Sequence, residues 1–144
     1  MNEADRQSMT HQIKLLVTVT ILKGSQVTYV HLDKGPDNES GLFLPNDVLN
    51  KGEDPYAAAK RVAKEQANID VADLKLVDVD SFEGRDGSWH VALHFKGAAP
   101  AEATLKAAAG LSLMMVNGTA LPADNQVAYG GWFNSVAKRA LQQA

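Results

Sequence analysis

Apolar positions in the first part of the chain follow the pattern of β-strands. Residues 13–22 form an apolar run rich in β-branched side chains, and residues 27–31 form a second run after the turn-like residues 23–26. Two such runs around a short segment that contains Gly predict a β-hairpin. A polar loop over residues 33–41 and a short apolar run over residues 42–44 follow, which predicts a third and brief strand.

A helix is predicted in the middle of the chain. Asp54 can cap the first free N–H groups of a helix, and Pro55 is tolerated at the first helical position. Residues 56–67 are rich in helix formers and contain no Gly or Pro, and Asn68 is a residue type that ends helices in a left-handed conformation. Val62 is apolar and β-branched, so we expect it to pack rather than to bind a ligand.

The second half of the chain returns to strand patterns and closes on a helix. The predicted elements are a strand over residues 74–82, a hairpin loop over residues 83–87, a strand over residues 89–95, a strand over residues 111–116 and a helix over residues 134–141. The Ala-rich stretch over residues 96–110 adds a predicted short helix over residues 101–109, because Ala favours helices and Pro100 precedes it.

These elements predict an α/β fold, a mixed β-sheet sandwiched between helices. The helix over residues 56–67 is expected on one side of the sheet and the helix over residues 134–141 on the other. A chain of 144 residues has the size of one domain with a sizeable core. We therefore predict a single domain over residues 13–144, preceded by a flexible polar segment over residues 1–12.

Residues 44–69 carry charged residues at a distinctive spacing. Seven residues separate Glu53 from Arg61, and Glu65 follows Arg61 after one helical turn. This stretch resembles the box of the Nudix hydrolases, G-x5-E-x7-R-E-U-x-E-E-x-G-U, in which U is aliphatic. The resemblance implies the Nudix fold, a role for Arg61 in orienting the loop and the glutamates, and a role for Glu65 as a metal ligand.

This chain departs from the Nudix pattern at the positions that carry its catalytic chemistry. Asp47 replaces the first Gly of the pattern, Val62 and Gln66 replace two of its Glu residues, and Asn68 replaces its closing Gly. Mg²⁺ binds through carboxylates and substrate phosphates, so Glu65 alone could contact an ion carried in on a nucleotide but could not organise a cluster of ions. Losing such a cluster costs orders of magnitude in rate. The prediction is a Nudix-fold protein with impaired or lost hydrolase activity that binds a nucleotide-like ligand or a partner.

Two flanking segments extend the resemblance over residues 13–141. Residues 82–95 resemble a segment of Nudix enzymes that act on ADP-ribose, which makes Arg85 a candidate ligand-binding residue. Residues 127–141 resemble the closing segment of those enzymes and of the Nudix-fold regulators of NAD metabolism. There an A-F-D-H sequence leads into the last helix, whereas residues 128–131 of this chain read AYGG, without the Asp and the His.

Two other functions stay open. An active hydrolase would cleave a nucleoside diphosphate linked to another moiety, such as ADP-ribose, with Mg²⁺ as cofactor and with Glu83 or Asp86 as base. A homodimer could act as an interaction subunit, since Nudix relatives that act on ADP-ribose often pair. The candidate catalytic residues are Arg61, Glu65 and Glu53, the candidate ligand-binding residues are Arg61, Glu65 and Arg85, and the candidate metal ligand is Glu65.

Composition excludes several function classes. The net charge of −3 and the lack of a basic stripe argue against a nucleic-acid surface, and the absence of Cys excludes disulfides, thiolate catalysis and Cys-ligated metals. No apolar stretch approaches the roughly 20 residues of a membrane helix, and residues 1–12 do not resemble a signal peptide, so we expect a cytoplasmic protein. His90 and His94 lie roughly 13 Å apart on a strand, which favours structural or surface roles over metal binding.

Overall fold

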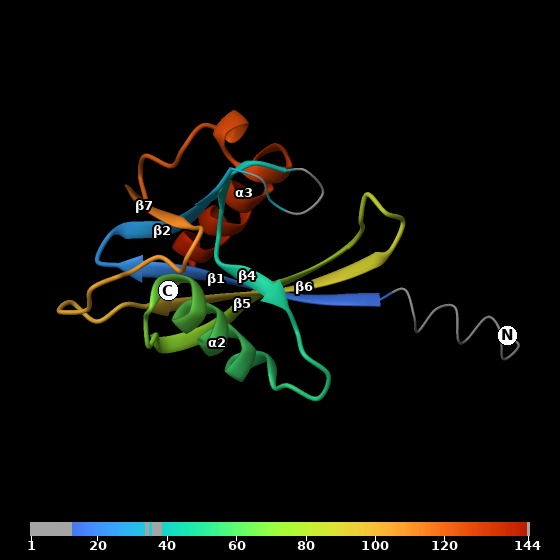
Figure 1. Ribbon diagram of the computed structural model, residues 1–144, viewed down its shortest axis with the longest axis horizontal. Helices are drawn as coiled ribbons and strands as arrows, with labels where there is room; N and C mark the ends of the chain where they lie inside the picture. Colours follow the sequence, from blue (N-terminus) through green and yellow to red (C-terminus); the bar gives the residue numbers. More distant parts are fainter. Residues whose placement is uncertain (1–12, 34, 36–38, 144) are drawn as a thin grey trace, which may run out of the picture.

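The computed structural model describes residues 13–33, 35 and 39–143. The predicted flexible segment over residues 1–12 lies outside the described residues. The elements are β1 (Ile13–Lys23), β2 (Gln26–Leu32), β3 (Gly41–Phe43), β4 (Asn46–Val48), α2 (Pro55–Ala67), β5 (Ala72–Glu83), β6 (Trp89–Ala98), β7 (Ser112–Asn117), the 3-10 helix η2 (Asp124–Gln126) and α3 (Ala128–Gln142). They form a seven-stranded mixed sheet with α2 on one face and α3 on the other, as predicted (Figure 1).

β1 is the central strand, and its pairing with two different strands at one edge sets the place where the sheet opens. The main path of the sheet runs β3-β2-β1-β6-β5, and β1 pairs in parallel with β6 from Ile13↔Trp89 to Leu22↔Ala98. At its other edge, β1 pairs with β4 near its start and with β2 at its end, where Leu22↔Val27 closes the predicted hairpin. β2 and β4 therefore diverge from the same strand edge, and the sheet opens between them.

Alternation along the strands builds a separate hydrophobic core on each face of the sheet. On β1, Val17, Val19 and Ile21 pack in the core that includes α2, whereas Thr18 on the same strand faces the other way. Val62 of α2 is fully buried in the first core, which confirms its predicted packing. The second core is formed by β2, β3 and α3, and its buried members are Val27, Tyr29, Leu42, Phe43, Leu44, Val127, Ala128, Phe133, Val136 and Ala137.

Both ends of α2 follow the sequence signals. The side chain of Asp54 accepts a hydrogen bond from Ala57 N at 3.0 Å, and Pro55 occupies the first helical turn. Asn68 is left-handed, with φ 58° and ψ 38°, and its backbone N–H bonds back to the helix. The predicted helix over residues 56–67 is thus confirmed to within one residue.

The predicted helix over residues 101–109 is wrong. These residues form turns and irregular backbone. Lys106 N donates to Ala67 O at 3.0 Å and Ala108 N donates to Gln66 O at 3.4 Å. The segment therefore satisfies the last carbonyl groups of α2, and these tertiary hydrogen bonds replace the local ones that a helix would make.

The sequence patterns also missed two short elements and the true start of the last helix. β4 and η2 contain three residues each, too few for a periodic signal. α3 begins at Ala128, six residues before the predicted start, and its first turn is left-handed. No helix in the described part of the chain combines the length and the apolar character that crossing a membrane requires.

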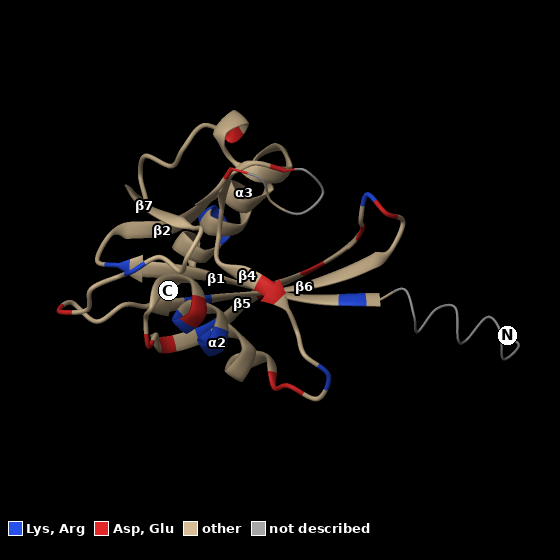
Figure 2. Cartoon of the chain, viewed as in Figure 1, with Lys and Arg blue, Asp and Glu red and all other residues tan. Residues whose placement is uncertain are grey.

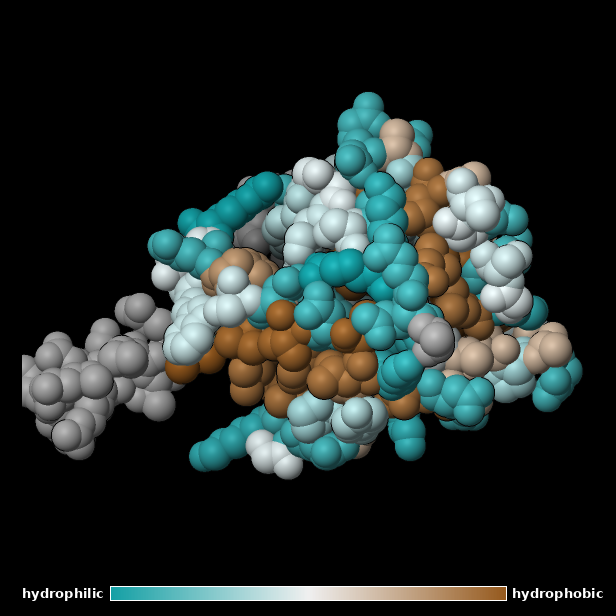
Figure 3. All heavy atoms as spheres, turned by 180° about the vertical axis from the view of Figure 1, so that it is seen from behind, coloured by the Kyte–Doolittle hydropathy of each residue, from teal (hydrophilic) through white to brown (hydrophobic). Residues whose placement is uncertain are grey.

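Hydrophobic side chains remain exposed on the β5–β6 hairpin. Trp89 on β6 is 45% exposed, and Leu76 and Val79 on β5 are exposed as well. Figure 3 shows hydrophobic residues gathered in a band on the side turned away in Figure 1. Because side chains alternate along a strand, Trp89 and His90 lie on opposite faces of the sheet.

Candidate functional site

A cleft of about 860 Å³ opens between β2, β4 and the β5–β6 hairpin. β4 and the end of α2 contribute Asn46, Asp47 and Gln66 to its lining. On the other side it is lined by the end of β5, the hairpin loop and α3. β2 and β4 diverge from β1, and this divergence leaves the cleft at the edge of residues 44–69, the stretch that resembles the Nudix box.

Arg61 binds three carboxylates next to the cleft. Its Nε donates to Glu53 Oε2 at 2.9 Å and its second Nη to Glu53 Oε1 at 3.1 Å, which makes a two-point contact. Its first Nη donates to Asp47 Oδ2 at 2.9 Å and to Glu65 Oε2 at 3.3 Å. Figure 2 shows acidic residues on β4 and before α2, close to the basic residues of α2. Arg61 and Glu65 therefore form an i,i+4 pair within a larger cluster.

The charges of this cluster hold one another in the ionised state. The hydrogen bonds from Arg61 lower the pKa of Glu53, with help from the backbone N–H of Asn50. The hydrogen bonds to Glu53, and then to Asp47, raise the pKa of Arg61 further above its usual range. Arg61 also donates to the carbonyl oxygen of Val48 at 3.2 Å. The guanidinium thus joins α2 to β4 and to the loop before the helix.

We expect Arg61→Lys to lower the melting temperature by several degrees, because Lys cannot make the two-point contact with Glu53 and also reach Asp47. Lys60→Ala, at an exposed position of the same helix, is the matched control and should leave the melting temperature within a degree or two. Thermal unfolding followed by circular dichroism measures both variants. Equal melting temperatures for the two would show that the cluster does not support α2.

Gln66 is tied to the backbone of β4. Its Nε2 donates to Asn46 O at 2.7 Å, and its Oε1 accepts from Asn46 N at 3.2 Å. A carboxylate could accept from the N–H group but would face the carbonyl oxygen without a proton to donate. The amide at this position therefore closes α2 onto β4, and the substitution of Gln for Glu has a structural reason.

The donor set at the three box positions does not fit a cluster of magnesium ions. Val62 has no donor atom and is buried, Gln66 is bonded to the backbone, and Glu65 is 55% exposed and paired with Arg61. Among the described residues, no group of three or more His, Asp or Glu side chains is placed to hold a metal ion. Of the candidate residues, Arg85 lines the cleft. Arg61, Glu65 and Glu53 do not line it, and Arg61 pairs with Asp47, which does.

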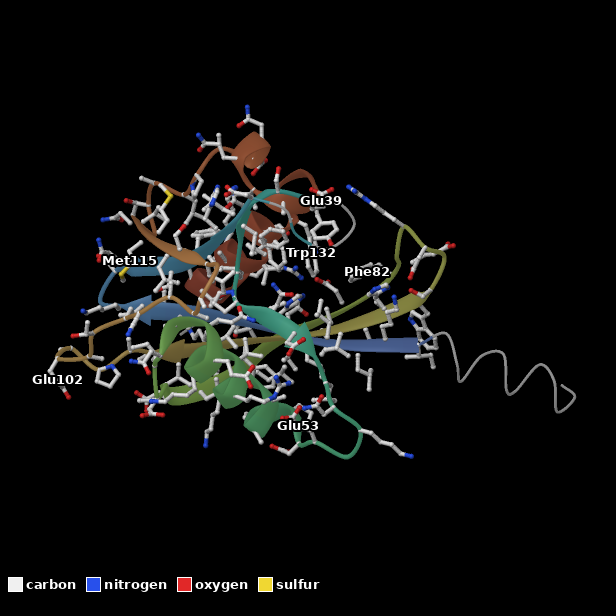
Figure 4. All side chains as sticks on the ribbon, viewed as in Figure 1. Glu39, Glu53, Phe82, Glu102, Met115 and Trp132 are labelled. Carbon is white, nitrogen blue, oxygen red and sulfur yellow. The ribbon has the colours of Figure 1, made fainter. Side chains whose placement is uncertain are left out.

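Aromatic side chains form the opposite wall of the cleft. Phe82 of β5 meets the ring of Trp132 of α3 edge to face at 5.3 Å, and it stacks on His90 at 5.2 Å. Figure 4 shows Phe82 and Trp132 near one another on the α3 side, with Glu53 on the α2 side. The ring of Phe133 packs against that of Trp132, with 4.9 Å between the two ring centroids.

A left-handed turn places Tyr129 in this wall. Tyr129, Gly130 and Gly131 all have positive φ, and a Cβ on Gly131 would lie 2.6 Å from the Cβ of Asp124. Only Gly fits at this position, which gives the AYGG sequence a structural reason. Tyr129 N donates to Glu39 Oε2 at 3.0 Å, Glu39 pairs with Arg85, and the Arg85 guanidinium lies 5.3 Å from the centre of the Tyr129 ring.

A polar network of part-exposed and buried side chains lies beside the aromatic wall. Asp80 Oδ2 can only accept, so His94 Nε2 carries the proton of their 2.8 Å hydrogen bond, and Thr18 Oγ1 then donates to His94 Nδ1 at 2.7 Å. Asp80 also accepts from Arg139, which in turn pairs with Asp78. The hydrogen bond from Arg139 contributes most to lowering the pKa of Asp80 to about 2. Because Thr18 and His94 are buried, the network is structural and does not form an accessible triad.

The sequence missed the aromatic wall. Five of the nine Phe, Tyr and Trp residues of the chain line the cleft: Phe43, Phe82, Tyr129, Trp132 and Phe133. The signal was the clustering of three of them at residues 129–133, but only the fold brings this cluster against Phe82. Arg85 is the one predicted ligand-binding residue that lines this part of the cleft.

Comparison with known proteins identifies the fold. No protein-family model and no curated protein sequence matches this chain. A MutT NUDIX hydrolase from Burkholderia pseudomallei superposes with a TM-score of 0.74 at 14% identity, covering 89% of this chain and 98% of that chain. A MutT/nudix family protein from Enterococcus faecalis gives 0.68 at 14% identity over 99% and 71% of the two chains. A NUDIX hydrolase from Nitrosomonas europaea gives 0.67 at 15% identity over 90% and 73%. The chain therefore has the Nudix fold, as the resemblance of residues 44–69 to the Nudix box implied.

Proposed function

We propose that this chain, which has the fold of the Nudix hydrolases, binds a nucleotide-like small molecule in its cleft without cleaving it. The observation that carries the proposal is the state of the three helix positions where the Nudix pattern has glutamates. Val62 is buried in the core, Gln66 is bonded to the backbone of Asn46, and Glu65 is paired with Arg61. Each of these side chains serves the packing of α2 rather than the binding of ions.

The lack of an ion cluster has an energetic consequence for a diphosphate bound in the cleft. Divalent ions bridge phosphate oxygens, stabilise the charge of the transition state and activate water, and together these effects supply several kcal/mol. One exposed carboxylate that already binds an arginine cannot assemble such a cluster. A diphosphate in this cleft would therefore lack the charge stabilisation that hydrolysis requires.

The cleft itself supports ligand binding. Its volume of about 860 Å³ falls within the range of small-molecule sites, and its lining combines aromatic rings with a few polar groups. Phe82 and Trp132 offer the flat apolar surface on which a base can stack. The presence of this wall beside an altered box favours binding over catalysis.

We expect purified protein with millimolar Mg²⁺ or Mn²⁺ to hydrolyse ADP-ribose no faster than buffer. The reason is that the box helix offers no ion cluster. Chromatographic quantification of AMP and ribose phosphate measures the rate, and an active Nudix hydrolase assayed in parallel is the control. Turnover above about 1 per second, an ordinary enzyme rate, would overturn the proposal.

An active hydrolase is the second candidate function, and the observation in its favour is that Glu83 and Asp86 line the same cleft. Lys14 and Ser88 bond to Asp86 and lower its pKa, which makes it a weak base. Glu83 is then the stronger candidate. If the hydrolysis assay gives turnover, its loss in Glu83→Gln would establish this function.

A further inference from the structure

The exposed hydrophobic side chains of this chain are clustered rather than scattered. Seven large hydrophobic residues are exposed in the described part of the chain, and five of them lie on β1, β5, β6 or the first turn of α2: Leu15, Tyr56, Leu76, Val79 and Trp89. The other two are Val48, in the cleft lining, and Met114, on β7. Single exposed hydrophobic residues are ordinary, whereas a contiguous group of them marks an interaction surface.

The strand register places this cluster on the α2 side of the sheet. Paired residues of β1, β6 and β5 form three rows, which are Ile13, Trp89 and Glu83; Leu15, Val91 and Ser81; and Val17, Leu93 and Val79. We call these three rows the apolar face. Residues paired directly across strands point to the same side, and Val17 and Leu93 pack in the core that includes α2. The whole apolar face therefore lies on that side, opposite to the cleft.

The helix covers only one end of the apolar face. Ile13, Leu15, Trp89 and Val91 pack in neither hydrophobic core. In Figure 1, the start of β1 and the β5–β6 hairpin extend past the end of α2. Leu76 pairs with Phe95, whose ring meets that of Tyr56 at 4.9 Å, so exposed apolar surface continues from the rows to the helix.

The chemistry of the apolar face favours another apolar surface as its occupant. Its three rows contain no Lys or Arg, which argues against a nucleic acid or an anionic membrane. Trp89 Nε1 donates to Ser81 Oγ at 2.6 Å, so the indole ring can be buried without leaving its N–H group unpaired. Residues 1–12, which precede β1, contain only three apolar residues and offer too little apolar surface to cover the rows.

The size of the apolar face is sufficient for a small dimer interface. Its exposed side chains, with Tyr56 and Leu76, present roughly 500 Å² of apolar surface, which is near the upper end for one patch on a monomer. Contact between two such surfaces would bury on the order of 1,000 Å², the lower bound for a specific interface. Two-fold symmetry brings the same patch of both copies together, and faces of two sheets pack well against one another.

We propose that two copies of this chain associate through their apolar faces, with Leu15, Val79 and Trp89 in contact with the partner. The proposal goes beyond the proposed function and does not depend on it. The same two strands carry Phe82 and His90 on their other side, where these rings stack in the cleft lining. The dimer therefore contacts the back of the aromatic wall and leaves the cleft open.

Sedimentation velocity from micromolar to submillimolar concentration tests the dimer. We expect a monomer–dimer equilibrium with a micromolar Kd, because the interface is small. Leu15→Lys and Trp89→Lys should each raise this Kd at least about tenfold, since each places an unpaired charge from both copies in an apolar contact. Met114→Lys is the matched control, an equally exposed hydrophobic residue on β7, and should leave the Kd unchanged.

Cross-linking locates the contact independently. The chain contains no Cys, so one introduced Cys is the only site for a bismaleimide. Ser81→Cys, exposed in the middle row of the apolar face, should give a covalent dimer at concentrations above the Kd. Thr119→Cys, exposed in the turn after β7, should give none.

Four results would overturn the proposal. The first is a parent that stays monomeric at submillimolar concentration, and the second is a dimer that both Lys variants leave intact. The third is a monomeric parent that floats with phosphatidylglycerol vesicles, which would assign the apolar face to a membrane. The fourth is a monomer whose melting temperature falls much further with Leu15→Lys than with Met114→Lys, which would assign the face to a segment of the same chain. Failure of the proposed function is recognised separately, as turnover of ADP-ribose.

Discussion

Val62→Glu should destabilise the fold by about 3 to 5 kcal/mol, enough to unfold a domain of ordinary stability. Val62 is fully buried and packs with Val17, Val19 and Ile21 against the sheet. A carboxylate placed there loses its hydration and gains no partner. Val62→Ala removes the same apolar contacts without adding charge and should cost only about 1 to 3 kcal/mol.

Urea unfolding of the two variants separates packing from charge. Burial raises the pKa of the introduced carboxyl above its unfolded value of about 4.3. Stability is then retained at low pH, where the group is neutral, and lost as the pH rises through the folded pKa. The difference between Val62→Glu and Val62→Ala should therefore grow between about pH 4 and pH 8. Equal stability at neutral pH would mean that this helix position faces solvent and is open to metal ions.

His94→Leu should cost about 1 to 3 kcal/mol at neutral pH. The substitution removes the acceptor of the Thr18 hydroxyl, which is fully buried, and one donor to Asp80. A buried polar group left without a partner costs most of its desolvation energy. Arg139 still binds Asp80, so the loss falls mainly on Thr18.

The same substitution should change how stability depends on pH. Burial lowers the pKa of His94, and this outweighs the opposing effect of the hydrogen bond to Asp80. Below the unfolded value of about 6.5, the unfolded chain takes up a proton that the folded chain resists. The free energy of unfolding therefore rises with pH up to that value and falls as the pH drops below it.

Denaturation curves between about pH 8 and pH 4.5 test this dependence. The parent should lose stability below about pH 6.5, and His94→Leu should show a flatter profile in that window. Asp80 titrates lower, with a pKa of about 2, and does not obscure the effect. His31→Leu, on β2 and half-buried, is the matched control and should keep the slope of the parent. Identical profiles for the parent and His94→Leu would show that His94 is not the titrating group.

Much of the fold could be predicted from local patterns. The β1–β2 hairpin followed from two β-branched runs around a Gly-containing turn, and the limits of α2 followed from Asp54, Pro55 and Asn68. These signals are local, because strand alternation and helix capping depend on residues within a few positions of one another. The spacing of Glu53 and Arg61 was equally informative, since their hydrogen bonds lie within the same loop and helix.

The other features of the fold and of the site depended on contacts between residues far apart in the sequence. The Ala-rich segment has high helix propensity, but its N–H groups bind free carbonyl groups at the end of α2 in place of the hydrogen bonds of a helix. Phe82 and Trp132 are 50 residues apart and meet only because β5 and α3 lie against the same region of the sheet. The sequence by itself determined the β1–β2 hairpin, the limits of α2 and which box residues are absent. The tertiary structure alone decided what Val62 and Gln66 do and where the aromatic wall stands, because burial and long-range hydrogen bonds are properties of the packed chain and not of any local pattern.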